Sequence, residues 1–196
     1  MSPALNQTAL ETLFLNARTF NQYLPKEVSD QTLRSLINLL KWGPTAVNCQ
    51  PGRFVFVKGK AAKEKLILAL NPGNIPKVTS APVTVIVAQD RRFYEYLPEQ
   101  WKPYDAAAPF RADENLREQT AFRNSSLQGA YLIIAARALG LDCGPMSGFD
   151  NRIVDREFFP EGRYQSNFLV NLGYGEPDGY YPRGPRLDFN EVAQIL

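Results

Sequence analysis

Hydrophobic positions recur along the chain in two different periods. After Ser29, an N-cap residue by type, leucine and isoleucine follow the i, i+3, i+4, i+7 spacing of an amphipathic helix, at Leu33, Leu36, Ile37 and Leu40. Gly43-Pro44 ends this helix. Further helices are predicted over residues 3–16, 60–70 and 112–139, the last with Gly140 as its C′ residue and an apolar stripe of Leu127, Tyr131, Ile134 and Ala138.

Three short runs predict strands. Residues 53–58 (RFVFVK) and 167–174 (NFLVNLGY) are aromatic and β-branched, whereas residues 83–88 (VTVIVA) are almost continuously apolar, as in a central strand covered on both faces. Asp188 with Glu191 three residues later predicts a capped terminal helix. Strands separated by helices of unequal length indicate one three-layer α+β or α/β domain over residues 1–196.

One segment, residues 93–110, has no assigned element. It is aromatic-rich and broken by three prolines, and it contains Phe93, Tyr94, Tyr96, Trp101, Tyr104 and Phe110. Two interpretations are open: packing over the core or across a dimer, or a mobile lid over a ligand, since long irregular segments are commonly functional.

The charge balance is nearly even, with 22 Lys+Arg against 20 Asp+Glu and a net charge of +2. Because nucleic-acid binding leaves a clustered basic excess, nucleic acid is not expected as a partner. No apolar run reaches membrane-spanning length, and the first residues lack the pattern of a signal peptide. The two cysteines, Cys49 and Cys143, are far apart and fit buried positions in a cytoplasmic protein.

The chain contains no histidine. Ser-His-Asp hydrolases, Cys-His proteases and His-ligated zinc sites are therefore excluded, and no metal site is expected. An enzyme of this composition needs another acid/base group or a cofactor that carries the reactive atom. Neither a G-x-G-x-x-G turn nor a G-x-x-x-x-G-K-[ST] loop is present, so a nucleotide-like ligand has to be held in another way.

Four separated segments resemble, in order and spacing, the nitroreductase family along nearly the whole chain. They are ARTFN at 17–21 with VSDQTL at 28–33, GPTAVNCQP at 43–51, GL at 140–141 with GPMSGFD at 144–150, and GYG at 173–175 with Arg183 and Arg186. The stretches KWGPTAVNCQP, QTAFRNSSLQGAYL and GPMSGFD resemble the subgroup of short members that includes malonic semialdehyde reductases of pyrimidine breakdown.

The resemblance implies a cofactor, a fold and an activity. The fold is an α+β three-layer α/β/α sandwich with a small, mainly antiparallel sheet, in a domain-entwined homodimer. The cofactor is FMN, with NADH or NADPH as co-substrate, and hydride passes in ping-pong fashion through flavin N5 to a small-molecule acceptor without a catalytic side chain. Malonic semialdehyde, nitroaromatics and quinones are the acceptors it suggests. The alternatives are a flavin-binding or storage module without turnover and a dehydrogenase that works in the opposite direction.

The site residues that the resemblance implies also suit the chemistry of FMN. Its dianionic phosphate needs guanidinium and hydroxyl donors, which Arg18, Thr19, Arg183 and Arg186 offer. Asn74 and Lys77 suit the pyrimidine edge and the charge at N1/O2 of the reduced ring. Pro145, Met146, Ser147 and Gly148 would lie against the ring with a backbone N–H toward N5, and Pro44, Thr45 and Asn48 would come from the partner subunit.

Several positions depart from the family pattern. Ala17 and Asn21 stand where the family has basic residues, although Asn21 stays a candidate for the cofactor site. Gly52 replaces a tryptophan and Ser147 a glutamate. For the substrate, Arg123 is a candidate partner of a carboxylate, and Tyr94, Trp101 and Tyr104 are candidate contacts. The alternative for Arg123 and Asn124 is a solvated or interface position on the long helix.

Overall fold

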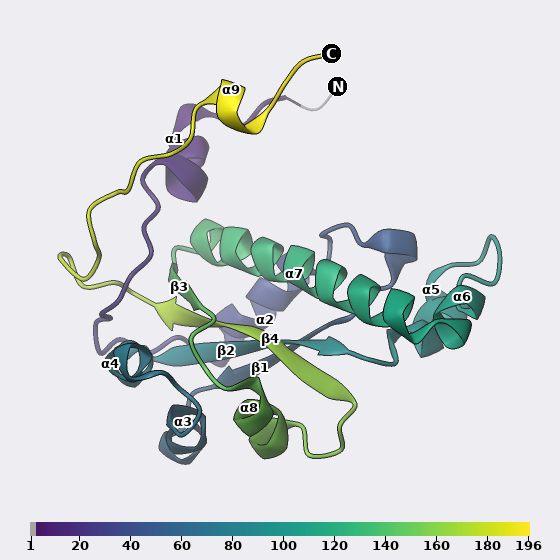
Figure 1. Cartoon of the computed structure of the whole chain (residues 1–196). Helices are drawn as coiled ribbons and strands as arrows, with labels where there is room; N and C mark the ends of the chain where they lie inside the picture. Colours follow the sequence, from purple (N-terminus) through teal and green to yellow (C-terminus); the bar gives the residue numbers. More distant parts are fainter. Residues whose placement is uncertain (1–2) are drawn as a thin grey trace.

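A four-stranded antiparallel sheet in the order β1-β2-β4-β3 lies at the centre of the chain. The computed structural model describes residues 3–196 (Figure 1). Within this range the strands are β1 (Gly52–Val57), β2 (Val83–Asp90), β3 (Asp142–Met146) and β4 (Tyr164–Gly173). The α-helices are α1 (Gln7–Leu10), α2 (Asp30–Leu40), α3 (Lys60–Ile67), α4 (Ile75–Ser80), α5 (Leu97–Gln100), α6 (Ala108–Ala112), α7 (Glu114–Ala138), α8 (Asn151–Phe158) and α9 (Phe189–Val192). A π-helical turn, η1 (Glu11–Leu15), and 3-10 turns η2 (Ala46–Asn48), η3 (Pro72–Asn74) and η4 (Phe93–Tyr96) complete the elements.

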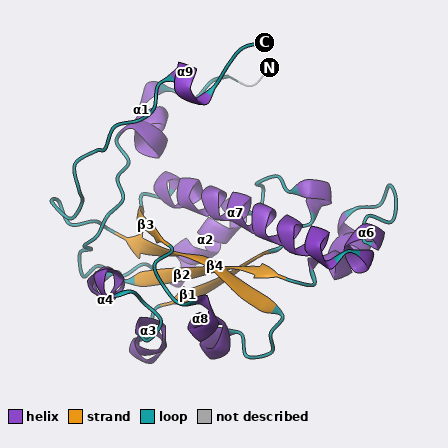
Figure 2. Cartoon of the chain, in the orientation of Figure 1, coloured by secondary structure: helices purple, strands orange, loops and turns teal. Residues whose placement is uncertain are grey.

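The helices cover both faces of the sheet (Figure 2). α2 and α7 pack on one face, where Val85 and Val87 of β2 meet Leu132 of α7. α3, α4 and α8 pack on the other, where Ile86 of β2 belongs to a second apolar cluster with Leu66. Every residue of β2 is buried, which confirms the predicted central strand. The α+β three-layer fold is likewise confirmed.

The strand register defines two ends of the sheet. At one end, the start of β1 pairs with the end of β2, as Gly52 lies opposite Gln89. We call it the Asp90 end. At the other end, Thr84 lies opposite Asn171 on β4, and Asn171 lies opposite Gly144 on β3. We call this the Cys143 end.

The predicted apolar stripe of α7 does not face the sheet. Leu127, Tyr131 and Ala138 are exposed, and only Ile134 is half-buried. The face that packs on the sheet carries small and polar residues as well as apolar ones: Thr120, Ala121, Asn124, Ser125, Gln128, Gly129, Leu132, Ala135 and Ala136. At Gly129 a Cβ would lie 2.3 Å from the ring of Phe168, so glycine lets the helix approach β4 closely. The buried polar groups find hydrogen bonds, which makes their burial tolerable.

Three predicted helix ends are confirmed in detail. Ser29 Oγ accepts a hydrogen bond from the Thr32 N–H at 3.1 Å, and α2 begins at the next residue. Gly140 has φ 74° after α7. The Asp188 N–H donates to the Glu191 carboxylate at 2.8 Å. Strand β3 was not predicted, since Gly144 and Pro145 within it hide the strand pattern. Helices α4 and α8 were not predicted either.

Residues 93–110 pack against the body of the molecule. Phe93, Leu97 and Phe110 are buried in a cluster with Cys49 and Ala121. This arrangement agrees with the packing interpretation. Tyr104, between α5 and α6, is 60% exposed.

The terminal segments extend away from the sheet (Figure 1). Arg183 links the two segments through hydrogen bonds to the carbonyls of Leu15 and Ala17. Among residues 3–196, no helix combines the length and the apolar character needed to cross a membrane.

Candidate functional site

A cavity of about 550 Å³ opens at the Cys143 end, and its lining is rich in cations. We call it the cation pocket. It is lined by Phe14, Ala17, Arg18, Thr19, Asn21, Lys77, Arg137, Tyr181, Pro182, Arg183, Gly184 and Arg186. Six predicted cofactor residues therefore come together there, from α4 and from two segments near the ends of the chain: Arg18, Thr19, Asn21, Lys77, Arg183 and Arg186.

Two backbone segments build the wall of the cation pocket. Thr19 forms a parallel bridge with Cys143 of β3, and the Phe20 N–H donates to the Cys143 carbonyl at 3.1 Å. Tyr180 bridges back to Phe20 in antiparallel fashion. Glycine at position 144 permits this close approach, because a Cβ there would lie 2.6 Å from the Tyr23 hydroxyl and 2.7 Å from the Phe20 carbonyl oxygen.

The positive charge of the cation pocket is not neutralised. Five cationic side chains line it, and its lining within residues 3–196 contains neither Asp nor Glu. Arg18 Nη1 and Arg137 Nε are buried without a hydrogen-bond partner among residues 3–196. Desolvation, and then the neighbouring Arg18, Arg186 and Arg137, lower the pKa of Arg183. Unpaired guanidinium groups gathered around one cavity suit an anion such as a phosphate.

Arg137 is a site residue that sequence reasoning missed. It lies in the last turn of α7, where a basic residue is expected simply because it favours a helix C-terminus. Its Nη1 donates to the Leu13 carbonyl at 2.9 Å, while its Nε has no partner in the described part of the chain. Arg137 thus supplies a cation beside Ala17 and Asn21, the positions where family basic residues are missing.

The predicted ring-binding segment lies next to the cation pocket along β3. Pro145 and Met146 end the strand, and Ser147 and Gly148 follow it. Asn74 Nδ2 donates to the Gly148 carbonyl at 3.0 Å, which connects the η3 turn to this segment. Pro145 and Ser147 are exposed, and no hydrogen bond within residues 3–196 uses the N–H groups of Ser147 and Gly148. These amides are available to a flat ligand.

Pro44, Thr45 and Asn48 lie elsewhere, at the Asp90 end. They belong to the segment between α2 and β1, which reaches the sheet at Gly52. Pro44 and Asn48 are exposed, and Asn48 Nδ2 donates to the Gln100 carbonyl at 3.4 Å. Within one chain, the two parts of the predicted cofactor site are separated by the length of the sheet.

The candidate substrate residues are not gathered in one cavity. Arg123 lies on the exposed face of α7, in a shallow groove of about 500 Å³ with Phe122 and Leu127. Tyr94, Trp101 and Tyr104 do not line that groove. Tyr94 instead packs edge-on against Phe93. Asn124, predicted to be solvated or at an interface, is buried, with 2% of its surface exposed; that prediction is wrong.

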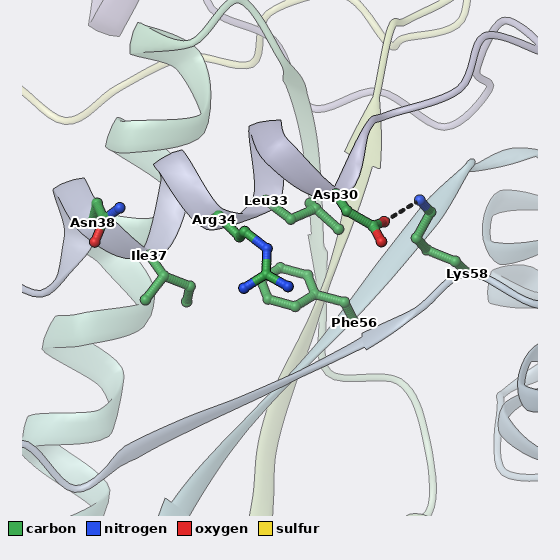
Figure 3. A pocket seen from close by; sticks show the side chains of 7 residues that line it. All are labelled: Asp30, Leu33, Arg34, Ile37, Asn38, Phe56 and Lys58. Atoms are coloured by element: carbon green, nitrogen blue, oxygen red, sulfur yellow. Dashed lines mark hydrogen bonds and ion pairs between the residues drawn. The ribbon is translucent and has the colours of Figure 1, made fainter.

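A second cavity, of about 640 Å³, lies between α2 and the edge strand β1 (Figure 3). Its floor is apolar, from Leu33, Ile37 and Phe56, and its rim is charged. Lys58 Nζ bonds Asp30 across one end at 2.7 Å. No group of three or more Cys, Asp or Glu that could hold a metal ion is present in the described part of the chain.

Comparison with known proteins agrees with this geometry. A Polynucleobacter asymbioticus protein named as an NADH dehydrogenase/NAD(P)H nitroreductase is 52% identical over 196 residues, with 100% of both chains covered. A Burkholderia lata protein of the same description is 56% identical over 191 residues, 97% of this chain and 98% of the relative. The fold matches that of an Exiguobacterium sibiricum nitroreductase solved in complex with FMN, at a TM-score of 0.83 and 19% identity, covering 100% of this chain and 99% of that one. Residues 15–174 match the sequence model of the Nitroreductase family, and the chain belongs to that family.

Proposed function

We propose that this protein is an FMN-dependent NAD(P)H oxidoreductase that works as a homodimer with two shared sites. The observation that carries the proposal is the uncompensated cation pocket beside the exposed segment Pro145 to Gly148. A phosphate group and a flat ring connected to it would find their partners in these two adjacent places. The relatives' names and the FMN complex of a structural neighbour point the same way.

The residues present fit FMN by the chemistry of their donors. The buried, unpartnered Arg18 Nη1 and Arg137 Nε would donate to the phosphate, with the Thr19 hydroxyl beside them. Lys77 would supply positive charge toward N1/O2 of the ring. The Ser147 or Gly148 N–H would donate toward N5.

When bound, FMN supplies the atom that accepts hydride from NAD(P)H and passes it to the acceptor. The chain's own side chains then bind, orient and exclude water, and none has to act as a general base. This division of work is consistent with a sequence that lacks histidine. Lys77, as a cation, favours the more negative, reduced form of the ring.

Support for a dimer comes from the surface of the single chain. A compact 22.1 kDa monomer exposes about 9,300 Å², whereas this chain exposes 11804 Å². The exposed large apolar side chains include Trp42 at 79%, Phe122 at 56% and Leu127 at 46%. Apolar surface of this kind, just after α2 and on α7, is typical of an interface with a second copy.

The separation of the two predicted halves of the site supports the same conclusion. Pro44, Thr45 and Asn48 lie at the Asp90 end and the cation pocket at the Cys143 end, so the two halves can meet only between two copies. In a dimer with two-fold symmetry, each copy would complete the site of the other.

The terminal arm after Tyr181 would entwine the two copies. Its exposed Leu187, Phe189 and Val192 match the apolar floor of the cavity between α2 and β1 (Figure 3). β1 is an edge strand, with backbone groups free to pair with another chain. The second copy's arm is the occupant that we assign to this cavity.

For the acceptor, we propose a small aldehyde acid such as malonic semialdehyde. Arg123, exposed on α7, would pair with its carboxylate. A broad reductase of nitroaromatics or quinones is the alternative within the enzyme class, and competition between these acceptors in steady-state assays distinguishes the two. A flavin-binding module without turnover would keep the cofactor but would not oxidise NADH with any acceptor.

The test begins with the absorbance spectrum of the purified protein. Flavin bands that bleach on anaerobic addition of NADH or NADPH, and return on addition of an acceptor, are the expected result. Light scattering at micromolar concentration should give the mass of a dimer, as expected of an obligate interface that buries more than about 2,000 Å². A 22 kDa monomer that retains bound FMN would contradict the shared site.

A further inference from the structure

The segment between α2 and β1 has an unusual backbone. Val47 has φ 44° and ψ 33°, Asn48 has φ 54° and Gln50 has φ 40°. These left-handed conformations are normally left to glycine, and a β-branched valine is the least suited to them. A conformation of this kind persists only where the surroundings hold it.

Two buried amides of α7 hold this segment at its two ends. The Ala46 N–H donates to Asn124 Oδ1 at 2.8 Å, just before the first strained residue. The Gly52 N–H donates to Gln128 Oε1 at 2.6 Å, just after the last one. Asn124 and Gln128 are 2% and 4% exposed, and four residues apart they lie on the same face of α7.

Glycine at position 52 makes the second contact possible. A Cβ there would lie 2.7 Å from Gln128 Oε1 and 3.0 Å from Gln128 Cδ. Any side chain would therefore displace the glutamine from the Gly52 N–H.

The position of α7 is itself fixed. Gly129, next to Gln128, lets the helix approach Phe168 so closely that a Cβ would lie 2.3 Å from its ring. Asn124 Nδ2 donates to the Thr120 carbonyl at 2.8 Å, which orients the amide with its oxygen toward Ala46. The two acceptor oxygens therefore stand on a rigid element.

We infer that Asn124 and Gln128 are positioning residues that impose the strained backbone of residues 46–52 and thereby present Asn48 to the flavin site of the second copy. The inference rests on the proposed function for its catalytic consequence. Neither residue touches the cofactor; both act through the segment that they hold.

Cys49 offers a direct measure of this segment, independent of the cofactor. Its thiol lies between Asn48 and Gln50 and is fully buried, and burial raises its pKa to about 11, so it reacts slowly when the segment is in place. Cys143, buried on β3, reports on the rest of the fold. Labelling with a maleimide, followed by mass spectrometry of each cysteine peptide, separates the two signals.

The test compares Gln128→Leu and Asn124→Leu with a matched control. Asn167→Ala removes two hydrogen bonds of 2.9 Å between β4 and α7, to Ser125 and Ser126, but leaves residues 46–52 untouched. Both leucine variants should label Cys49 about tenfold faster than the parent or more, the factor expected from the loss of one buried acceptor. Labelling of Cys143 should stay unchanged, and the control should label Cys49 like the parent. Gln128→Glu, which keeps an acceptor oxygen, should restore slow labelling.

Kinetics then test the consequence for the site. In the leucine variants, kcat for acceptor reduction should fall about tenfold while FMN affinity stays within about threefold, because the arginines proposed to hold the phosphate are unchanged. Slow Cys49 labelling in both variants would overturn the inference. Fast labelling with unchanged kcat in a yellow, active dimer would overturn its catalytic part. A parent protein that contains no flavin and does not oxidise NADH would instead contradict the proposed function. The labelling result would still test, independently, whether Asn124 and Gln128 hold residues 46–52.

Discussion

The two ends of the sheet use arginine in opposite ways. At the Asp90 end, Arg53 and Arg163 both bond the carboxylate of Asp90, which is fully buried, at 2.7 and 3.0 Å. Arg163 also bonds Glu95 at 3.1 Å. The hydrogen bond to Asp90 is the main reason why the pKa of Arg163 is raised.

At the Cys143 end, the arginines of the cation pocket form no ion pair with an acid of residues 3–196. The pKa of Arg183 is lowered there, by desolvation and by Arg18, Arg186 and Arg137. A paired arginine stabilises the chain that contains it, whereas an unpaired group of arginines stores repulsion that a bound anion relieves. The difference between a structural arginine and a binding arginine therefore lies in the acid beside it, which sequence spacing does not reveal.

Removal of the shared acid should have the largest effect. Asp90→Ala leaves two guanidinium groups without their common partner, and we expect a loss of about 3–5 kcal/mol in the free energy of unfolding. Urea denaturation followed by circular dichroism measures it. Glu95→Gln, at an exposed partner of Arg163, is the control and should cost no more than about 1 kcal/mol. Equal losses in the two variants would remove the distinction between buried and exposed acids.

Arg18→Ala tests the opposite end and should act on binding rather than on stability. FMN binding should weaken by about 1.5–3 kcal/mol, the loss of a charge-assisted hydrogen bond. The free energy of unfolding without ligand should change by less than about 0.5 kcal/mol, since no acid loses its partner. Fluorescence titration gives the affinity. The control variant Arg91→Ala, at a surface arginine paired with Glu118, should leave the FMN affinity unchanged. FMN bound as tightly as in the parent would make Arg18 an ordinary surface residue.

The variant Arg137→Met tests whether α7 contributes to anion binding in the cation pocket. We expect FMN affinity to fall about tenfold, which corresponds to about 1.4 kcal/mol. Arg137→Lys, which keeps the charge, should retain most of the affinity. FMN titrations of both variants, and of the double variant Arg18→Ala/Arg137→Met, complete the test. Strict additivity would argue against a shared anion, because two groups on one phosphate are expected to be coupled.

Lys77→Met should have the smallest effect on binding and the most specific one on chemistry. The flavin reduction potential should fall and hydride transfer from NADH should slow, because a cation near N1/O2 favours the reduced ring. Oxidised FMN should still bind, and stability should change by no more than about 0.5 kcal/mol. Potentiometry measures the reduction potential, and stopped-flow reduction by NADH measures the rate of hydride transfer. If both the potential and the rate equal those of the parent, Lys77 does not belong to the site.

The sequence alone was sufficient to predict the elements that are determined by local interactions. Ser29 caps α2 with its own hydroxyl, Gly140 takes the positive φ that ends α7, and the apolar run of β2 needs cover on both faces. The cofactor candidates of the cation pocket could also be named from the sequence, because their segments resemble the nitroreductase family and their side chains suit a phosphate.

What only the tertiary structure decided depends on partners far away along the chain. The apolar stripe of α7 does not mark the face that packs on the sheet. The polar residues of that inner face are satisfied by Ala46 and Gly52, about 80 residues earlier in sequence. Arg137 has the sequence context of an ordinary helix end, and the pocket around it forms only when residues 17–21 and 181–186 meet. Whether a buried polar group or a charge is structural or functional is decided by what packs against it, and packing is a property of the folded chain.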